Sequence, residues 1–411
     1  MNTLLLLTII ITTYAALAFI NQRFLKLPSS IGLMLISLIL SLIVISVGTY
    51  NHTFHLFVGK VVQGVDFSKT LLNVMLGFLL FSGSLHIDLE QLRKQYIAVV
   101  SFSTLSVALS TFFFGGLMWF VFRVFNDPVE FIYCLWFGAL LSPTDPIAVL
   151  GILKKSNIPQ AIKTTINGES LFNDGIGIVF FVTIGSVAQY GLNSIDFLSV
   201  AQLFLTQVIG GLLFGVALAY VALYFIRKID DYQTEIVISL AFVMMSGMMA
   251  SYLDVSGPLA VIILGLALGN KSGKMAMSGE SRDYFYKFWD LVDSFLNGIL
   301  FVLMGLQMVL MPFLYNYIII GVVAIILLLL CRYISLRLPM LFIRNKELYN
   351  RKTALLMTWG GLRGGLSLAL TLSLPENPYK KILVSSSYLI VIFSILVQGL
   401  TTDKLVKRLY R

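Results

Sequence analysis

An Asn-Asp pair lies within a stretch of the chain that is otherwise apolar enough to cross a lipid bilayer. Residues 168–180 read GESLFNDGIGIVF, and the pair is Asn173-Asp174. Ionisable side chains at membrane depth are costly, face the protein interior and commonly mark proton or ion pathways. Ser170 lies four residues before Asp174, so the two share one face of a helix, with Asn173 one position away. This pattern predicts a transport site centred on Asp174.

The oxygen atoms of this segment are donors that hard monovalent cations prefer. Carboxylate, hydroxyl and carbonyl oxygens bind such ions by the chemistry that governs Mg²⁺ and Ca²⁺ sites. We expect these three side chains to converge with Thr144, where an interrupted helix would free a further oxygen for a dehydrated Na⁺. Burial also favours the neutral carboxylic acid. A proton and a cation would therefore compete for Asp174, which is the physical basis of antiport.

Two further charges within apolar stretches are expected to neutralise each other. Glu169 lies five residues before Asp174, about 140° round the helix at about 100° per residue, so it addresses a different neighbour. Arg332 offers bidentate hydrogen bonds and stays charged. We predict a structural ion pair between Glu169 and Arg332, rather than a transport role for Glu169, because an unpaired buried charge is strongly destabilising.

Two apolar stretches contain residues that disfavour a continuous helix. Residues 142–146 read SPTDP, in which each proline removes a backbone donor and clashes with the preceding turn. Residues 359–365 read WGGLRGG, with four glycines around one arginine. Asp145 and Arg363 lie at these breaks. Because half-helix ends carry uncompensated dipole charge, we expect these two side chains to neutralise those ends.

Composition places all these residues in an all-α polytopic membrane protein. The 411 residues are 58% hydrophobic and 12% charged, with a mean hydropathy of +0.90. Apolar windows of about 20 residues predict about 13 transmembrane helices. They lie near residues 3–20, 28–49, 69–87, 96–125, 130–152, 164–190, 197–226, 235–252, 257–269, 285–310, 313–341, 353–374 and 382–403.

The two interrupted helices are the fifth and the twelfth spans, and this separation predicts an inverted repeat. Spans 1–6 and spans 8–13 would cross the membrane in opposite senses, with span 7 as the connector. Broken, crossing helices 5 and 12 would then form a site near the midplane. The alternative is two unrelated kinks, since transmembrane helices often contain proline and glycine.

The positive charges are expected to gather on one face of the membrane. The net charge is +9, and an N-terminus outside the cell would place most of the 29 Lys and Arg residues in the cytoplasm. This distribution predicts a multi-pass protein of the plasma (cell inner) membrane with a cytoplasmic C-terminus, and nothing in it indicates nucleic-acid binding. The outer face would carry Lys60, Lys69, Arg123, Lys380 and Lys381.

The chain lacks the sequence motifs of several functional classes. The chain has no Walker A motif, no dinucleotide-binding fingerprint, no zinc-ligand cluster and no hydrolase elbow, so we expect neither an enzyme nor a cofactor. The longest soluble segments are expected to be loops near 50–68 and 270–284, with no soluble regulatory domain. His86, Asp290 and Asp293 are expected to be solvated, interfacial or paired rather than ligands.

Six motifs together resemble the monovalent cation/proton antiporters of the NhaP and animal sodium/proton exchanger type. They follow one another in the expected order over most of the chain, and five or six motifs in register are hard to obtain otherwise. The motifs are SPTDPIAV at 142–149, GESLFNDG at 168–175, SGPLAVIILGLALGN at 256–270, FLNGILFVLMGLQM at 295–308, GGLRGGLSLAL at 360–370 and VQGLTTDKLV at 397–406.

The resemblance implies a shared binding site for proton and cation. Asp174 would bind each in turn, and its neighbours would be Asn173, Ser170 and Thr144, with Asp174, Ser170 and Thr144 as the Na⁺ ligands. Electrogenic relatives carry a second Asp where this chain has Asn173. The resemblance therefore implies electroneutral one-for-one exchange of Na⁺ or Li⁺ for H⁺, in the service of pH homeostasis.

The resemblance also assigns the remaining charges. Glu169 and Arg332 match the family's buried ion pair, and Asp145 and Arg363 match the charges at its crossing half-helices. One position departs from the family's pattern. Several archaeal relatives have an acidic residue in the third span where this chain has Ser82, so an additional cation ligand or gate carboxylate would be absent here.

A homodimer in which a transport subdomain moves against a dimer subdomain is a further implication of the resemblance. The only small species implied are the transported ions. The dimer-type subdomain would comprise about 1–90 and 235–311, the transport subdomain about 96–190 and 313–403, and the linking helix 197–226.

Other functions remain open on the residues alone. A K⁺/H⁺ antiporter of the same fold is the nearest alternative, because selectivity among alkali ions depends on fine cage geometry. A passive cation channel or a non-transporting sensor is disfavoured, because broken helices around a titratable ligand indicate a carrier and no signalling domain is appended. A transporter of organic anions ranks last, since a buried carboxylate would repel its substrate.

Overall fold

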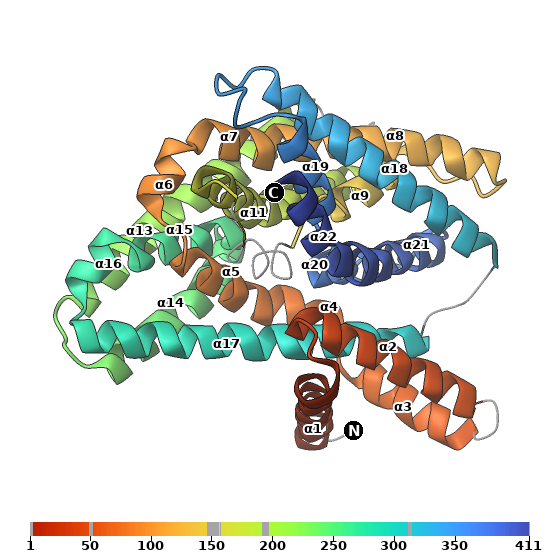
Figure 1. Cartoon of the computed structure of the whole chain (residues 1–411), viewed down its shortest axis with the longest axis horizontal. Coiled ribbons are helices and arrows are strands. Elements are labelled where there is room, and N and C mark those ends of the chain that lie inside the picture. Colours follow the sequence, from red (N-terminus) through yellow and green to blue (C-terminus); the bar gives the residue numbers. More distant parts are fainter. Residues whose placement is uncertain are drawn as a thin grey trace.

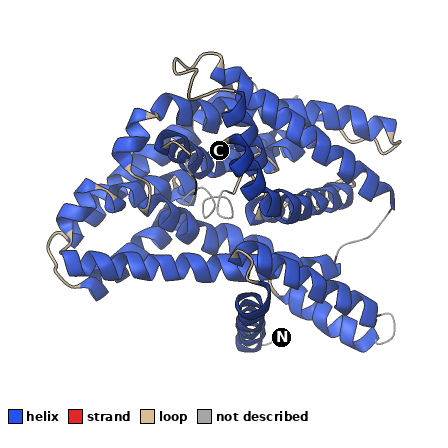
Figure 2. Ribbon diagram, viewed as in Figure 1, coloured by secondary structure: helices blue, strands red, loops and turns tan. Residues whose placement is uncertain are grey.

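The computed structural model is an all-α protein and describes residues 3–48, 52–145, 156, 158–190, 197–310 and 315–410. Within these ranges ten helices are long and apolar enough to cross a membrane. Two shorter apolar helices, Phe131–Leu140 and Gly257–Gly269, accompany them. Figure 2 shows helices joined by short loops, with no strand among the described residues. The predicted class, an all-α polytopic membrane protein, is confirmed.

The helices follow one another with short connections. Several neighbours are continuous through π-helical turns, at Leu71–Met75, Ser101–Leu105, Thr206–Gly210 and Ser394–Gln398. The helices are α1 (Thr3–Ile20), α2 (Ser29–Gly48), α3 (His52–Gly64), α4 (Phe67–Thr70), α5 (Leu76–Leu85), α6 (Leu89–Lys94), α7 (Tyr96–Val100), α8 (Ser106–Val124), α9 (Phe131–Leu140), α11 (Gln160–Tyr190), α12 (Phe197–Leu205), α13 (Gly211–Ile226), α14 (Tyr232–Tyr252), α15 (Gly257–Gly269), α16 (Lys271–Ala276), α17 (Gly279–Leu306), α18 (Tyr315–Met340), α19 (Arg351–Gly360), α20 (Gly365–Leu372), α21 (Lys380–Phe393) and α22 (Gly399–Leu409).

The arrangement places two groups of helices on either side of a central region (Figure 1). The long helix α17 packs against α2 and α5, while α15 packs against α5 and α13. On the other side, α8 packs against α9 and α18, and α18 packs against α21. Helix α11 contacts α9 and α15, and so lies between the two groups.

Polar side chains fix where several helices begin. The Asn350 side chain accepts hydrogen bonds from the backbone N–H groups of Lys352 and Thr353 at the start of α19. Asp231 accepts from the N–H of Thr234 at the start of α14. Each such cap is typically worth about 1 kcal/mol, and it satisfies a backbone donor that the helix leaves free.

Helices α9 and α19 both end in the central region, at the two positions where proline and glycine predicted breaks. Helix α9 ends at Leu140 and the chain continues in a non-helical conformation to Asp145; residues 146–155, including Pro146, lie outside the described residues. The second break separates α19 from α20. The two breaks touch where the Asp145 N–H donates to the Leu362 carbonyl at 2.7 Å.

Two segments predicted as loops are helical instead. Most of residues 50–68 forms α3, which packs against α2, and residues 270–284 contain α16 and the start of α17. In α3, Lys60 and Gln63 break the apolar run in the sequence, but both are exposed while Val61 and Val62 are buried. The loop prediction was wrong because an amphipathic helix buries only one face.

Candidate functional site

The Asn-Asp pair lies in the middle of α11, where it meets the first break. Asn173 is completely buried and donates to the Thr144 hydroxyl at 2.6 Å. The Thr144 N–H donates in return to the Asn173 side-chain oxygen at 3.3 Å. Gly177 allows α11 to approach the break closely because it has no side chain. A Cβ at this position would stand 2.6 Å from the Pro143 ring. Asn173 therefore holds the non-helical backbone of the break against α11.

A buried ion pair lies next to this contact. The Arg332 guanidinium donates to Glu169 Oε1 at 2.5 Å, and the two side chains are 2% and 3% exposed. The same carboxylate oxygen accepts from the Asn173 amide at 2.9 Å. A charge-assisted chain of hydrogen bonds thus runs from Arg332 in α18 through Glu169 and Asn173 to Thr144.

Arg363 links the two breaks. Its guanidinium donates to the Ser142 carbonyl at 2.5 Å and the Pro143 carbonyl at 2.9 Å, just beyond the C-terminal end of α9. A cation at this end faces the negative end of the helix dipole and carbonyls that lack helical partners. Asp145, which belongs to the first break, lies against Gly364 of the second break, at the start of α20. Each charge thus faces a half-helix end of opposite sign.

Two residues of the π-helical turn between α21 and α22 complete the second break, and the sequence analysis assigned a role to neither. The Arg363 N–H donates to Ser394 Oγ at 2.8 Å, and Ser394 donates to Gln398 at 2.7 Å. The Gln398 amide donates to the Trp359 carbonyl at 3.0 Å, in the last turn of α19. Gln398 lies in the VQGLTTDKLV motif, which marked this segment. Its residue type alone gave no sign that it would contact the second break.

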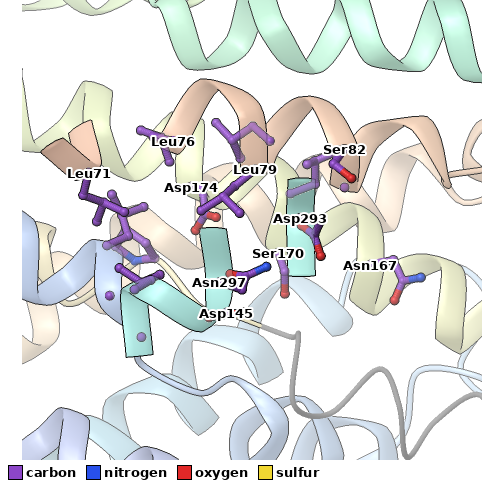
Figure 3. Close-up of a pocket in the computed structure, with 18 of the residues that line it drawn as sticks. Leu71, Leu76, Leu79, Ser82, Asp145, Asn167, Ser170, Asp174, Asp293 and Asn297 are labelled. Atoms are coloured by element: carbon purple, nitrogen blue, oxygen red, sulfur yellow. The ribbon is translucent and has the colours of Figure 1, made fainter. Parts of the chain in front are cut away.

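The Asp174 carboxylate faces a cavity of about 750 Å³ between α5, α11, α17 and the breaks (Figure 3). Asp174 is half-buried, whereas Ser170, on the same face of α11, is 3% exposed and lines the same cavity. Asp145 lines it as well. Among the described residues Asp174 makes no ion pair, in contrast to Glu169.

The structure brings the eight predicted residues into one region but gives them different surroundings. Asp174, Ser170 and Asp145 border the cavity, while Thr144 and Asn173 are fully buried and hold each other. The other three, Glu169, Arg332 and Arg363, are buried in the interactions described above.

Three residues expected to be solvated, interfacial or paired border the cavity. They are His86, Asp290 and Asp293, and His86 pairs with Asp290 at 2.9 Å. Ser82 is 1% exposed and donates to the Trp289 carbonyl at 3.1 Å, so it ties α5 to α17. The sequence missed this lining because the side chains come from helices distant in the chain.

A tight contact at the second break predicts a sensitive position. A Cβ added to Gly364 would stand 2.7 Å from Asp145 Oδ2 and 3.0 Å from Asp145 Cβ. We expect Gly364→Ala to displace Asp145 and lower the transport rate at least about 10-fold, with little loss of folding, because a side-chain end can move. The measurement is flux in proteoliposomes. Gly247→Ala is the control, since nothing lies within 4 Å of that position; equal rates for the two variants would contradict the expectation.

Comparisons with known proteins show the family and the fold of this chain. Residues 7–408 match the family described as "Sodium/hydrogen exchanger, transmembrane". The chain is 41% identical over 399 residues to the Na(+)/H(+) antiporter NhaP of Pseudomonas aeruginosa, covering 96% of this chain and 94% of that protein. It is 33% identical to the Na(+)/H(+) antiporter NhaH of Halobacillus dabanensis, covering 99% and 96%. The solved structure of the sodium proton antiporter MjNhaP1 from Methanocaldococcus jannaschii shares the fold, with a TM-score of 0.71 at 20% identity over 93% of this chain and 98% of that chain.

Proposed function

Because this chain belongs to the sodium/hydrogen exchanger family, we propose that it is a secondary antiporter that exchanges Na⁺ or Li⁺ for H⁺ across the membrane, with Asp174 as the shared site. One observation carries the proposal. Within the part of the chain that the structure describes, Asp174 faces the cavity and makes no ion pair, whereas Glu169 is neutralised by Arg332 and Arg363 is held by two carbonyls. A carboxylate at membrane depth needs a neutralising partner, and here that partner must enter from the cavity.

Two ions meet this requirement in turn. A proton converts Asp174 to the neutral acid, and a cation replaces it by binding the carboxylate with the Ser170 hydroxyl. Since one carboxylate accepts either one proton or one monovalent cation, exchange is electroneutral and one for one. Thr144 supports this site through Asn173 and contributes an oxygen if it turns towards the cation.

Alternating access follows from how the cavity is bounded. Its walls come from α5 and α17 on one side and from α11 and the breaks on the other. These helices fall in the two subdomains proposed above, residues 1–90 with 235–311 and residues 96–190 with 313–403. We propose that the second group moves against the first, which forms a homodimer, while 197–226 links them.

The proposed orientation places this cavity on the cytoplasmic side. With the N-terminus outside, α5 ends at the inner face, and His86 directly after it borders the cavity. Most basic loop residues then face the cytoplasm of a cell bounded by this plasma membrane. The structure then corresponds to an inward-open state, from which internal Na⁺ would leave the cell in exchange for protons.

A second candidate function differs only in the transported cation. A K⁺/H⁺ antiporter would use the same Asp174 and the same breaks. We favour Na⁺ because the relatives named above are Na(+)/H(+) antiporters. The site offers a carboxylate and a hydroxyl close to a tightly packed break, which suits a small dehydrated ion.

Proton flux in proteoliposomes tests the proposal. Purified protein would be given Na⁺, Li⁺ or K⁺ in turn against an imposed pH gradient, with the membrane potential clamped. We expect Na⁺ and Li⁺ to drive proton movement and the rate to be independent of the clamped potential. Flux with K⁺ alone would establish the second candidate, and no flux with any cation in folded protein would favour a channel or sensor.

A further inference from the structure

Helix α17 carries a second polar pair that faces the same cavity. Asp293 and Asn297 are one helical turn apart, so they share a face, and both line the cavity that Asp174 and Ser170 border from α11. Figure 3 shows the four side chains around this space. Neither of these two residues of α17 belongs to the cation site proposed at Asp174.

Asn297 lacks the hydrogen bonds that a buried amide requires. Its side chain is buried, with 6% of the residue exposed, and among the described residues neither its nitrogen nor its oxygen makes a hydrogen bond of ordinary geometry. The Asp293 carboxylate, one turn earlier, is close enough to interact with the Asn297 amide nitrogen. Buried polar groups are almost always satisfied by protein, water or a ligand. The Asn297 side-chain oxygen is therefore left for a water molecule or an ion in the cavity that it lines.

Position along the cavity gives the pair a place on the route to Asp174. Asp290 lies three residues before Asp293 and is 62% exposed, in contact with His86, so it marks the outer part of the cavity. Asp293 and Asn297 lie deeper along α17. They also line a second cavity of about 340 Å³ that reaches towards α1 and α2. The pair therefore borders both cavities.

We propose that Asp293 and Asn297 form an outer subsite for the transported monovalent cation, in which the ion keeps part of its water before it reaches Asp174. The proposal rests on the cation exchange proposed above. A carboxylate oxygen and an amide oxygen are suitable ligands for a hard cation, and water completes its shell. A negative group in a low-dielectric cavity also raises the local cation concentration.

The kinetic test separates recruitment of the cation from its exchange. We expect Asp293→Asn to raise the apparent KM for Na⁺ on the cavity side by about 5-fold to 10-fold, with a maximal rate within about 2-fold of wild type, because cation capture is weakened while Asp174 is intact. Asp293→Glu keeps the charge, so its KM for Na⁺ should lie closer to wild type than that of Asp293→Asn. Asp283→Asn is the matched control, since Asp283 lies exposed on the same helix and away from the cavity.

The binding test asks directly for a second site. Purified Asp174→Asn protein would be titrated with radioactive Na⁺ at equilibrium, with folding checked by monodispersity and thermal stability. We expect weak saturable binding that the double variant Asp174→Asn with Asp293→Asn loses. No binding to the single variant, or equal binding to both, would overturn the subsite.

The two proposals fail in distinguishable ways. If wild-type protein exchanges no cation, antiport fails, and the binding titration still decides whether Asp293 holds Na⁺. If exchange proceeds but Asp293→Asn leaves both the KM and the residual binding unchanged, only the subsite is wrong.

Discussion

Replacing Asp174 by asparagine is expected to abolish cation-dependent proton movement, down to the level of protein-free liposomes. Asparagine has nearly the same shape, so α11 and its contacts with the first break should persist. It neither carries the exchanged proton nor supplies a negative charge to the cation. The protein should therefore remain folded while both halves of the exchange stop, in the same flux assay with Na⁺, Li⁺ and K⁺.

The control for this result is a carboxylate of the same type outside the site. Asp283→Asn removes one negative charge from an exposed position on α17 and should exchange like wild type. If Asp174→Asn exchanged at wild-type rates, the shared-carboxylate mechanism would be wrong. If Asp174→Asn were inactive but aggregated, misfolding would account for the lost activity. The folding of the variant is therefore measured separately.

Truncating Glu169 is expected to have its main effect on stability. Glu169→Ala leaves the buried Arg332 without its partner, and removing one member of a buried ion pair typically costs about 3 to 5 kcal/mol. It also removes the oxygen that holds the Asn173 amide. We expect a large fall in melting temperature and in the yield of monodisperse protein, measured in detergent by thermal unfolding.

Two further variants separate charge from packing. Glu169→Gln keeps the shape and a hydrogen-bond acceptor, so we expect a smaller loss than for Glu169→Ala. The charge-swapped pair Glu169→Arg with Arg332→Glu should recover part of the stability that either single change removes, because the buried charges again cancel. Unchanged stability in Glu169→Ala would show that the pair contributes nothing to the fold.

The architecture was predictable where the signal was local. Long apolar stretches indicated the spans, and proline and glycine indicated both breaks, because bilayer thickness and backbone chemistry act on consecutive residues. Helix α3 was missed because the prediction also averaged over consecutive residues. Lys60 and Gln63 fall on its exposed face, so a hydropathy window averages them with the buried Val61 and Val62.

The contents of the site were predictable only in part. Spacing along α11 put Ser170 and Asp174 on one face, but it did not indicate that Asn173 would bond to Glu169 as well as to Thr144. Asp293 and Ser394 were beyond reach, because their roles depend on which helix faces which. The cavity is built from five segments spread between Leu71 and Ser367, and no local pattern encodes that neighbourhood.

The bond between Arg363 and the Ser142 carbonyl has a consequence for how the protein is made. The two residues are 221 positions apart in the chain, so the first break is synthesised long before the second. At chain elongation rates of about 5 to 20 residues per second, the carbonyls of the first break wait about 10 to 45 s for their guanidinium. During that interval these carbonyls lack the partner that covers them in the folded protein, so the two breaks can be joined only after Arg363 has been synthesised.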